Sequence, residues 1–85
     1  MDIVFTDTAL ADLQYWKKKK DIKIQNRITI LLEDIKEHPF TGLGKPEALR
    51  FNLSGYWSRR ITNEHRIVYR IDKNKVVVIA LRHHY

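Results

Sequence analysis

The chain has 85 residues, 44% of them hydrophobic and 11% aromatic, and a formal net charge of +6. This composition is typical of one small globular domain, residues 1–85, and excludes a disordered chain. The absence of cysteine excludes disulfides and thiolate chemistry, and the absence of a long apolar run or signal peptide predicts a cytoplasmic protein without a membrane partner.

The first half of the chain predicts one strand and two helices. Ile3–Phe5 has the character of a short strand, and Thr6 is a residue type that caps helices. Apolar residues then recur at helical spacing as far as Trp16, before a run of four lysines. A second helix is predicted from about Asp21. It must end before Pro39, because the residue preceding a proline is disfavoured in helical geometry.

The second half predicts a loop at residues 40–47 followed by four strands. Ser54-Gly55 is a two-residue hairpin signal between the first two of them. The predicted strands comprise residues 49–53, 56–62, 66–71 and 75 to about 83. The predicted fold class is therefore α+β, in the order β-α-α-β-β-β-β. An antiparallel sheet with two helices packed on one face is expected.

The sequence of the last two predicted strands also indicates which of their residues pair. If residues 72–74 form a three-residue loop, Ile71 pairs with Lys75 and Arg66 with Ala80. One face is then apolar and lies under the helices; it comprises Ile67, Tyr69, Ile71, Val77, Ile79 and Leu81. The opposite, uncovered face carries Arg66, Arg70, Arg82 and His84. A loop of two or four residues would mix the two sets, so the pattern favours three.

The excess of positive over negative charge is confined to the second half of the chain. Residues 1–43 hold seven Lys/Arg and seven acids, whereas residues 44–85 hold nine Lys/Arg against three acids. Six of those nine cations are arginine, whose planar guanidinium suits phosphate oxygens. The distribution predicts a polyanionic partner; a basic protein without such a partner is the open alternative.

No metal or cofactor site is predicted. The four histidines are scattered, and no two show the i, i+4 spacing of a helical zinc pair. The glycines at 42 and 44 lack the spacing and the strand–helix context of a phosphate-binding loop. The candidate chemistry therefore rests on acids, imidazoles and guanidinium groups alone.

Three residues carry that candidate chemistry: Glu47, Arg66 and His84. Separately they have ordinary explanations, namely a solvated carboxylate, a surface cation and a histidine near a chain end. Together they match metal-free RNA cleavage, in which a base deprotonates the 2′-OH, an acid protonates the leaving 5′-oxygen and a guanidinium stabilises the phosphorane. From the residues alone, a non-catalytic nucleic-acid-binding module is favoured over this nuclease.

Several motifs of the chain closely resemble the YoeB family within the RelE toxin superfamily. The similarity extends over essentially all 85 residues. The matching motifs are Lys45-Pro46-Glu47, Asn52–Thr62, Glu64-His65-Arg66, Tyr69 and His83-His84-Tyr85. The resemblance implies a microbial RNase-like fold and a toxin that cleaves messenger RNA on the ribosome.

The resemblance also implies residue roles. Glu47 would be the general base, His84 the general acid and Arg66 the group that stabilises the transition state. Lys45, Arg50 and Arg60 would bind phosphates and ribosomal RNA, and Tyr85 would place the substrate. Arg59 and His83 complete the predicted RNA-binding set. Two positions depart from the family pattern: Arg50 replaces an expected lysine, and His83 replaces an expected aromatic residue such as tyrosine.

The implied partners are mRNA on the 70S ribosome, ribosomal RNA and a YefM-like antitoxin, whose acidic tail would cover the basic face. A homodimer is implied by the family only. The alternatives are a non-catalytic basic RNA- or ribosome-binding module and, as a third class, an antitoxin-like or purely structural interaction protein.

Overall fold

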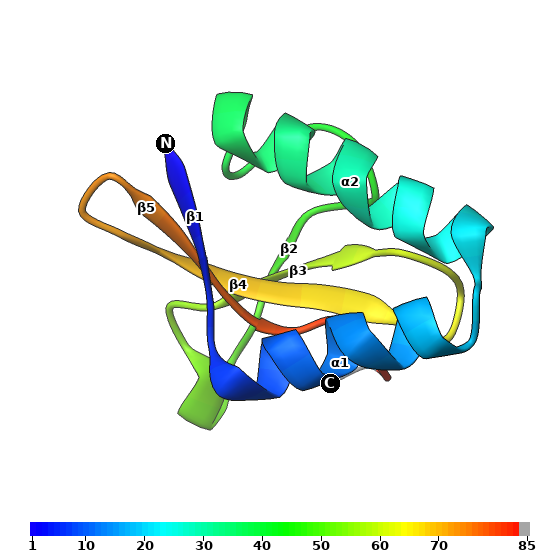
Figure 1. The fold of residues 1–85 in the computed structure, drawn as a ribbon. Helices are drawn as coiled ribbons and strands as arrows, with labels where there is room; N and C mark the ends of the chain where they lie inside the picture. The colour runs from blue at the N-terminus through cyan, green and yellow to red at the C-terminus, as the bar shows by residue number, and fades with distance from the viewer. Residues whose placement is uncertain (84–85) are drawn as a thin grey trace.

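The computed structural model describes residues 1–83, which form two helices and a five-stranded sheet (Figure 1). The helices are α1 (Asp7–Lys18) and α2 (Ile22–Glu37), with a short 3₁₀ helix, η1, at Phe51–Leu53. The strands are β1 (Asp2–Phe5), β2 (Glu47–Ala48), β3 (Trp57–Arg60), β4 (Arg66–Asp72) and β5 (Lys75–Ala80). The predicted α+β class and element order are confirmed.

The sheet is mixed, with the strand order β1-β5-β4-β3-β2. Strands β2 to β5 pair antiparallel, but β1 pairs parallel to β5, so the expected fully antiparallel sheet is wrong at this edge. A parallel neighbour requires a long crossover connection, and the two helices between β1 and the other strands are part of one. No helix within residues 1–83 is long and apolar enough to cross a membrane.

Side-chain caps start both helices where the sequence predicts. The Thr6 hydroxyl accepts a hydrogen bond from the Ala9 N–H (3.3 Å), and the Asp21 carboxylate accepts one from the Ile24 N–H (3.0 Å). Each cap satisfies a backbone donor that has no partner within its own helix. Helix α2 ends at Glu37, two residues before Pro39, as expected.

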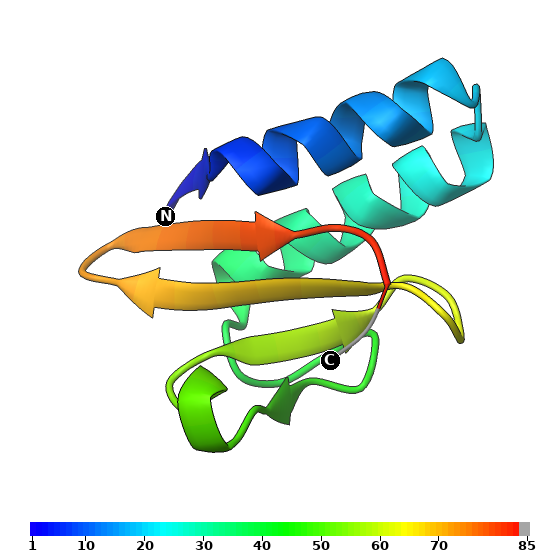
Figure 2. The ribbon, with the colours of Figure 1, turned by 90° about the horizontal axis from the view of Figure 1, so that it is seen from below.

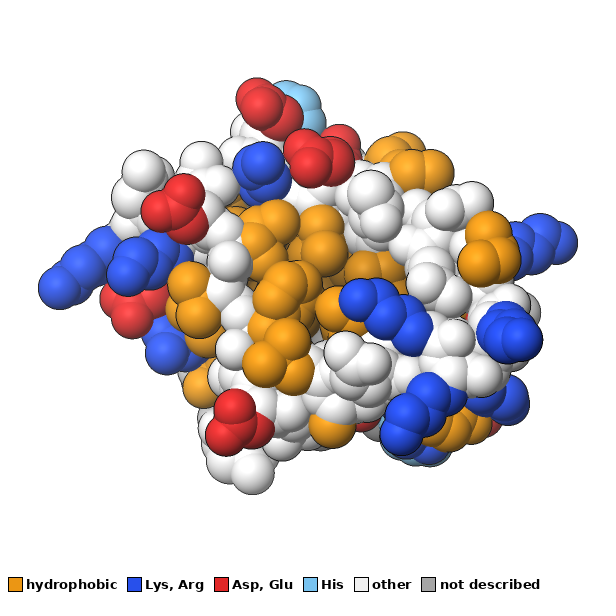
Figure 3. All heavy atoms as spheres, in the orientation of Figure 1, with side chains coloured by type: hydrophobic (Ala, Val, Ile, Leu, Met, Phe, Trp, Pro, Cys, Tyr) orange, Lys and Arg blue, Asp and Glu red, His pale blue; other side chains and the backbone are white. Residues whose placement is uncertain are grey.

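The two helices occupy different places around the sheet. Helix α2 crosses one face, whereas α1 lies beside α2 at the side of the sheet formed by β1 and β5 (Figure 2). The buried core lies between them and combines both helices with β4 and β5; it includes Trp16, Ile28, Leu31, Ile35, Ile67, Tyr69, Val76 and Val78. Between α1 and α2, hydrophobic side chains also reach the surface (Figure 3).

The predicted register of the last hairpin is wrong by one residue. The turn has two residues, Lys73 and Asn74, and Asp72 pairs with Lys75. Lys73, the first residue of the turn, adopts the left-handed backbone conformation (φ 57°). Val76 and Val78 therefore enter the core, in place of the predicted Val77 and Ile79. Ile3 and Phe5 of β1 pair with these two valines and pack against the same core.

A β-bulge then restores the predicted face at the far end of the hairpin. Tyr69 pairs with Val78 but Val68 pairs with Ala80, so Ile79 is the extra residue. The bulge shifts the alternation by one, and Leu81 is fully buried as predicted. Val68 and Ala80 point away from that core yet are also buried, so the opposite face of the sheet is not uniformly uncovered.

The connection between β2 and β3 is longer than the predicted Ser54-Gly55 hairpin. The last hydrogen bond before it joins the Leu49 N–H to the Tyr56 carbonyl (2.9 Å), and η1 lies between them. Phe51 begins η1 in the left-handed region (φ 59°) and is 90% exposed. The predicted strand at residues 49–53 is therefore a loop.

Candidate active site

A small pocket of about 160 Å³ contains most of the predicted site residues described by the structure. It is formed by the loop before β2 together with β2, β3 and β4. The lining residues are Lys45, Pro46, Glu47, Ser58, Arg60 and Arg66. Lys45, Glu47, Arg60 and Arg66 were predicted from the sequence, whereas Pro46 and Ser58 were not assigned a role.

Strand register explains why these residues meet. Glu47 pairs with Ser58 across β2 and β3, and Arg60 pairs with Arg66 across β3 and β4. Alternate residues of a strand point to the same face, so Ser58 and Arg60 share the face that Glu47 and Arg66 occupy. The i, i+2 spacing of Ser58 from Arg60 was the signal in the sequence that could have identified Ser58.

The loop before β2 is held close to β3 at Gly44. The Gly44 carbonyl accepts a hydrogen bond from the Arg60 N–H (2.7 Å). A Cβ at Gly44 would lie 2.9 Å from a Leu31 methyl and 3.1 Å from the Arg60 carbonyl, and the backbone has φ 78°. Only glycine fits this position without displacing a neighbour. The contact sets the position of Lys45, the next residue, at the mouth of the pocket.

The pocket is lined by three cationic side chains and one carboxylate. Within residues 1–83, Glu47 has neither a side-chain hydrogen bond nor an ion pair within 4.0 Å, and its side chain is exposed. Nη1 of Arg66 is shielded from solvent and has no hydrogen-bond partner in this part of the chain. Such a buried donor without an acceptor is uncommon and carries a desolvation cost. A phosphate oxygen is the kind of acceptor that a guanidinium group binds well.

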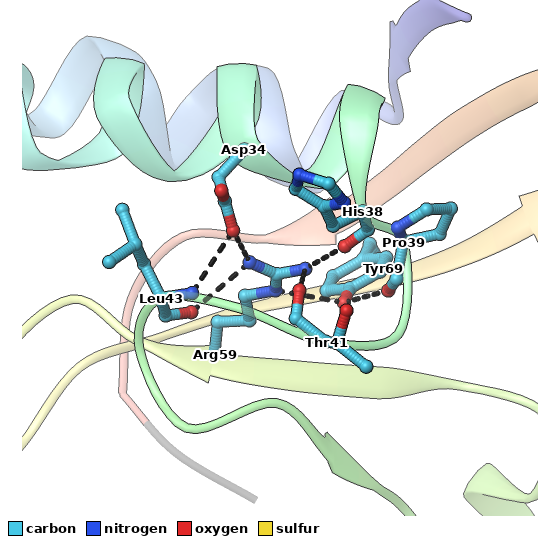
Figure 4. Close-up of polar contacts among 7 residues, drawn as sticks. All are labelled: Asp34, His38, Pro39, Thr41, Leu43, Arg59 and Tyr69. Carbon is cyan, nitrogen blue, oxygen red and sulfur yellow. Dashed lines mark hydrogen bonds and ion pairs between the residues drawn. The ribbon is translucent and has the colours of Figure 1, made fainter.

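Arg59, the residue between Ser58 and Arg60, points to the opposite side of β3 and is fully buried (Figure 4). Its guanidinium forms an ion pair with Asp34 of α2, and its Nε donates to the Tyr69 hydroxyl (3.1 Å). The remaining N–H groups donate to backbone carbonyls of the loop after α2, those of His38, Thr41 and Leu43. The predicted contact of Arg59 with RNA is therefore wrong.

This buried network fixes the loop that leads into the pocket. The Asp34 carboxylate also accepts the Leu43 N–H (3.0 Å), and the Tyr69 hydroxyl donates to the Pro39 carbonyl (2.6 Å). Helix α2, the loop after it and strands β3 and β4 thus meet at one guanidinium group. Sequence reasoning missed Asp34 and the structural role of Arg59, because both look like ordinary surface charges in the sequence.

The other predicted residues lie outside the pocket lining. Arg50 is exposed in the loop before η1, and His83 is exposed just beyond β5. Arg82 does not share the face of Arg66 as predicted; its guanidinium lies 3.6 Å from the ring centre of Tyr15 on α1. Arg82 lies beyond the end of β5 at Ala80, so strand alternation does not set its direction. His84 and Tyr85 lie outside the described residues.

The Arg59 network predicts a loss of stability in acid. The Leu43 N–H and the Arg59 guanidinium lower the pKa of Asp34 below its ordinary value. The ionised carboxylate therefore stabilises the fold above about pH 3.9, and this contribution is lost as the pH falls through the lowered pKa. Wild type should exceed Asp34→Asn in unfolding free energy by about 1–3 kcal/mol at pH 7. Urea unfolding should show this gap narrowing below about pH 3.9; a constant gap would contradict the role of the charge.

The described residues hold no group of three or more His, Cys, Asp and Glu side chains placed to bind a metal ion. The pocket instead combines a carboxylate that has no ion-pair partner within residues 1–83 with two guanidinium groups and an ammonium group. These groups can take up a proton, bind a phosphodiester and stabilise negative charge on phosphorus.

Comparison with known proteins identifies close relatives. The model of the family of YoeB-like toxins of bacterial type II toxin–antitoxin systems matches residues 5–85. Toxin YoeB of Synechocystis sp. is 47% identical over 85 residues, which cover 100% of this chain and 98% of the relative. A YoeB/ParE toxin from Agrobacterium tumefaciens has a similar structure, with a TM-score of 0.94, 42% identity and complete coverage of both chains.

Two structures of Staphylococcus aureus proteins are similar as well. One is a heterotetrameric YoeB-YefM toxin–antitoxin complex, with a TM-score of 0.89, and the other is a YoeB dimer, with a TM-score of 0.90. Both chains are 40% identical to this one, and each match covers 100% of this chain and 98% of the other.

Proposed function

Because the chain belongs to the YoeB-like toxin family of bacterial type II toxin–antitoxin systems, we propose that it is a ribosome-dependent endoribonuclease that cleaves mRNA in the ribosomal A site. One observation supports this proposal most strongly: the carboxylate of Glu47, which has no ion-pair partner among the described residues, lines the same pocket as Lys45, Arg60 and Arg66. A purely structural carboxylate in such surroundings would be expected to form an ion pair with one of those cations.

In the proposed reaction the nucleophile comes from the substrate. Glu47 takes the proton of a ribose 2′-OH, whose oxygen attacks the adjacent phosphorus. The bond from phosphorus to the 5′-oxygen breaks, and a general acid, proposed to be His84, protonates that oxygen. The products are a 2′,3′-cyclic phosphate and a 5′-hydroxyl. No metal-activated water is needed, because the attacking oxygen belongs to the RNA.

The cations are proposed to act on the phosphate. Nη1 of Arg66, which has no hydrogen-bond partner in the described part of the chain, would donate to a non-bridging oxygen, on which charge builds up as the 2′-oxygen attacks. Lys45 and Arg60 line the same pocket as the carboxylate and would bind the flanking phosphates. Arg50, exposed in the loop after β2, would reach ribosomal RNA or a more distant phosphate.

The small size of the pocket supports a requirement for the ribosome. Proton transfer by positioned side chains contributes about 10²–10⁴-fold, and much of the remaining acceleration must come from aligning the 2′-OH with the scissile bond. A pocket of about 160 Å³ holds little more than one phosphate and its ribose. We therefore propose that the ribosome holds the mRNA in the reactive conformation, and we expect only weak cleavage of free RNA.

The proposed protein partner binds the cationic side chains of the pocket. A YefM-like antitoxin would bind its toxin through acidic residues that cover Lys45, Arg60 and Arg66, and thereby keep RNA out. The YoeB-YefM complex from Staphylococcus aureus supports a partner of this kind, and the YoeB dimer supports homodimerisation. Cytoplasmic action on translating ribosomes is part of this proposal.

Expression of wild type, Glu47→Ala and His84→Ala in growing cells tests the proposed activity. Wild type is expected to stop growth and to produce new mRNA 5′ ends at positions set by the reading frame. Each variant should reduce these cuts by about 10²–10⁴-fold, the usual contribution of one acid or base. Growth arrest with intact transcripts would instead indicate a non-catalytic ribosome-binding module. Harmless expression of wild type would indicate an interaction protein.

A further inference from the structure

The segment that follows β5 is held by four hydrogen bonds from other parts of the chain. The Asp12 carboxylate accepts the Leu81 N–H (2.9 Å), and the Trp16 indole donates to the Leu81 carbonyl (2.9 Å). Two residues later, the His83 N–H donates to Nδ1 of His65 (2.8 Å), and the His83 carbonyl accepts the Arg66 N–H (2.8 Å). Both ends of residues 81–83 therefore have fixed positions.

His65 is the only side chain among these partners that changes its hydrogen-bonding character near neutral pH. Its ring packs edge-on against Trp16, with 4.8 Å between ring centres, and lies 5.7 Å from the ring of His83. Nε2 lies 3.6 Å from the Glu64 carboxylate, which favours the tautomer with the proton on Nε2. Nδ1 then carries no hydrogen and accepts the hydrogen bond from the His83 N–H.

From this geometry we propose that His65 is a positioning residue, which holds His83 through a neutral imidazole and so fixes the point from which residues 84 and 85 continue. The same contact connects His83 to Arg66, because His65 and Arg66 are consecutive and bond to the N–H and C=O of that one residue. The effect on RNA cleavage rests on the proposed function, whereas the effect on His83 does not.

Protonation should abolish this contact, because an imidazolium has a hydrogen on Nδ1 and cannot accept one. Burial against Trp16 lowers the pKa of His65, and the nearby charges of His83, Arg82 and Lys19 act in the same direction, while Glu64 opposes them. The imidazole is therefore neutral at pH 7. Its contact with His83 is expected above about pH 6.5 and is lost as the pH falls through the lowered pKa.

Two substitutions separate the acceptor from the bulk of the ring. In His65→Asn, the side-chain oxygen takes the place of Nδ1 and does not titrate, so the contact is kept at every pH. His65→Leu keeps apolar contact with Trp16 but has no acceptor. Hydrogen exchange of the His83 amide in the purified full-length protein, followed by NMR between pH 5 and 8, measures the contact directly.

The expected result is distinct for each protein. Wild type should lose protection of the His83 amide in acid, His65→Asn should keep it throughout, and His65→Leu should lack it at every pH. Steady-state cleavage of mRNA on ribosomes should give a kcat about 10²-fold lower for His65→Leu, with KM nearly unchanged and activity restored in His65→Asn. Unaltered protection of His83 in His65→Leu, or in wild type at low pH, would overturn the proposal.

The two measurements also separate this proposal from the proposed function. Hydrogen exchange of the His83 amide is measured without ribosomes or RNA. It therefore tests the positioning role of His65 even if wild type cleaves no mRNA. If His65→Leu does not fold, the comparison of wild type with His65→Asn across the pH range remains decisive. A pH response of the His83 amide that is identical in these two proteins would rule out His65 as its source.

Discussion

Replacing Arg59 with methionine is expected to lower the free energy of unfolding by about 3–5 kcal/mol, the usual cost of breaking a buried ion pair by removing one partner. Methionine fills much of the volume of the arginine stem but provides no hydrogen-bond donor. The Asp34 carboxylate and the carbonyls of His38, Thr41 and Leu43 would lose their buried partner. A small domain has about 5–15 kcal/mol of stability in total, so this variant should be close to unfolding.

Arg60→Met is the matched control for stability, because Arg60 is the next residue of the same strand and is exposed. Its unfolding free energy should differ from wild type by no more than about 0.5 kcal/mol. Urea titration followed by circular dichroism distinguishes the two variants. Equal stability of Arg59→Met and Arg60→Met would show that the buried network contributes little beyond its volume, and Arg59→Lys would then also be tolerated.

Replacing Arg66 with methionine is expected to cause a large loss of activity and no loss of stability, in contrast to the replacement of Arg59. Removing one donor that stabilises a developing oxyanion typically costs 10²–10³-fold in kcat. The Arg66 guanidinium has a buried Nη1 without a partner in residues 1–83, so deleting it also removes a desolvation cost. Unfolding free energy should therefore stay equal to that of wild type or rise.

Arg70→Met provides the comparison for that prediction. Arg70 lies on β4 four residues after Arg66 and does not line the pocket; it forms an ion pair with Asp72 (3.1 Å). Its loss should leave ribosome-dependent cleavage within about twofold of wild type, because a half-exposed pair contributes little. If Arg66→Met and Arg70→Met reduce cleavage equally, the cations act through general attraction to RNA, and the specific role of Arg66 is refuted.

The sequence predicts the elements of this fold better than their register. Thr6, Asp21 and Pro39 each leave a local signal at a helix end, and the structure has the helix ends where these signals place them. Residues 76–81 are all apolar, so alternation along β5 cannot show which of them face the core. The segregation of Arg66, Arg70, Arg82 and His84 from the apolar residues favoured a three-residue loop, but the hairpin has a two-residue turn and a bulge.

The residues of the candidate site were also predicted only in part. Lys45, Glu47, Arg60 and Arg66 were identifiable because they are charged residues within motifs of a recognisable family, and the structure brings these four together. Arg59 and Arg60 are identical in type and adjacent, so only the face on which each lies distinguishes a buried structural group from an exposed one. The Asp34 partner that explains Arg59 is 25 positions away in the chain, where no local pattern connects them.

The buried guanidinium of Arg59 has a further consequence for how β3 finds its place. This strand has four residues and pairs with a neighbour that is largely apolar, so its backbone alone distinguishes poorly between adjacent alignments. A slide by one position would expose Arg59 to water, and the slide that brings Ser58 to the place of Arg59 would leave the Asp34 carboxylate of α2 without its cation. The buried charge thus disfavours that alignment, and the alignment of β3 determines which of its two arginines meets the solvent.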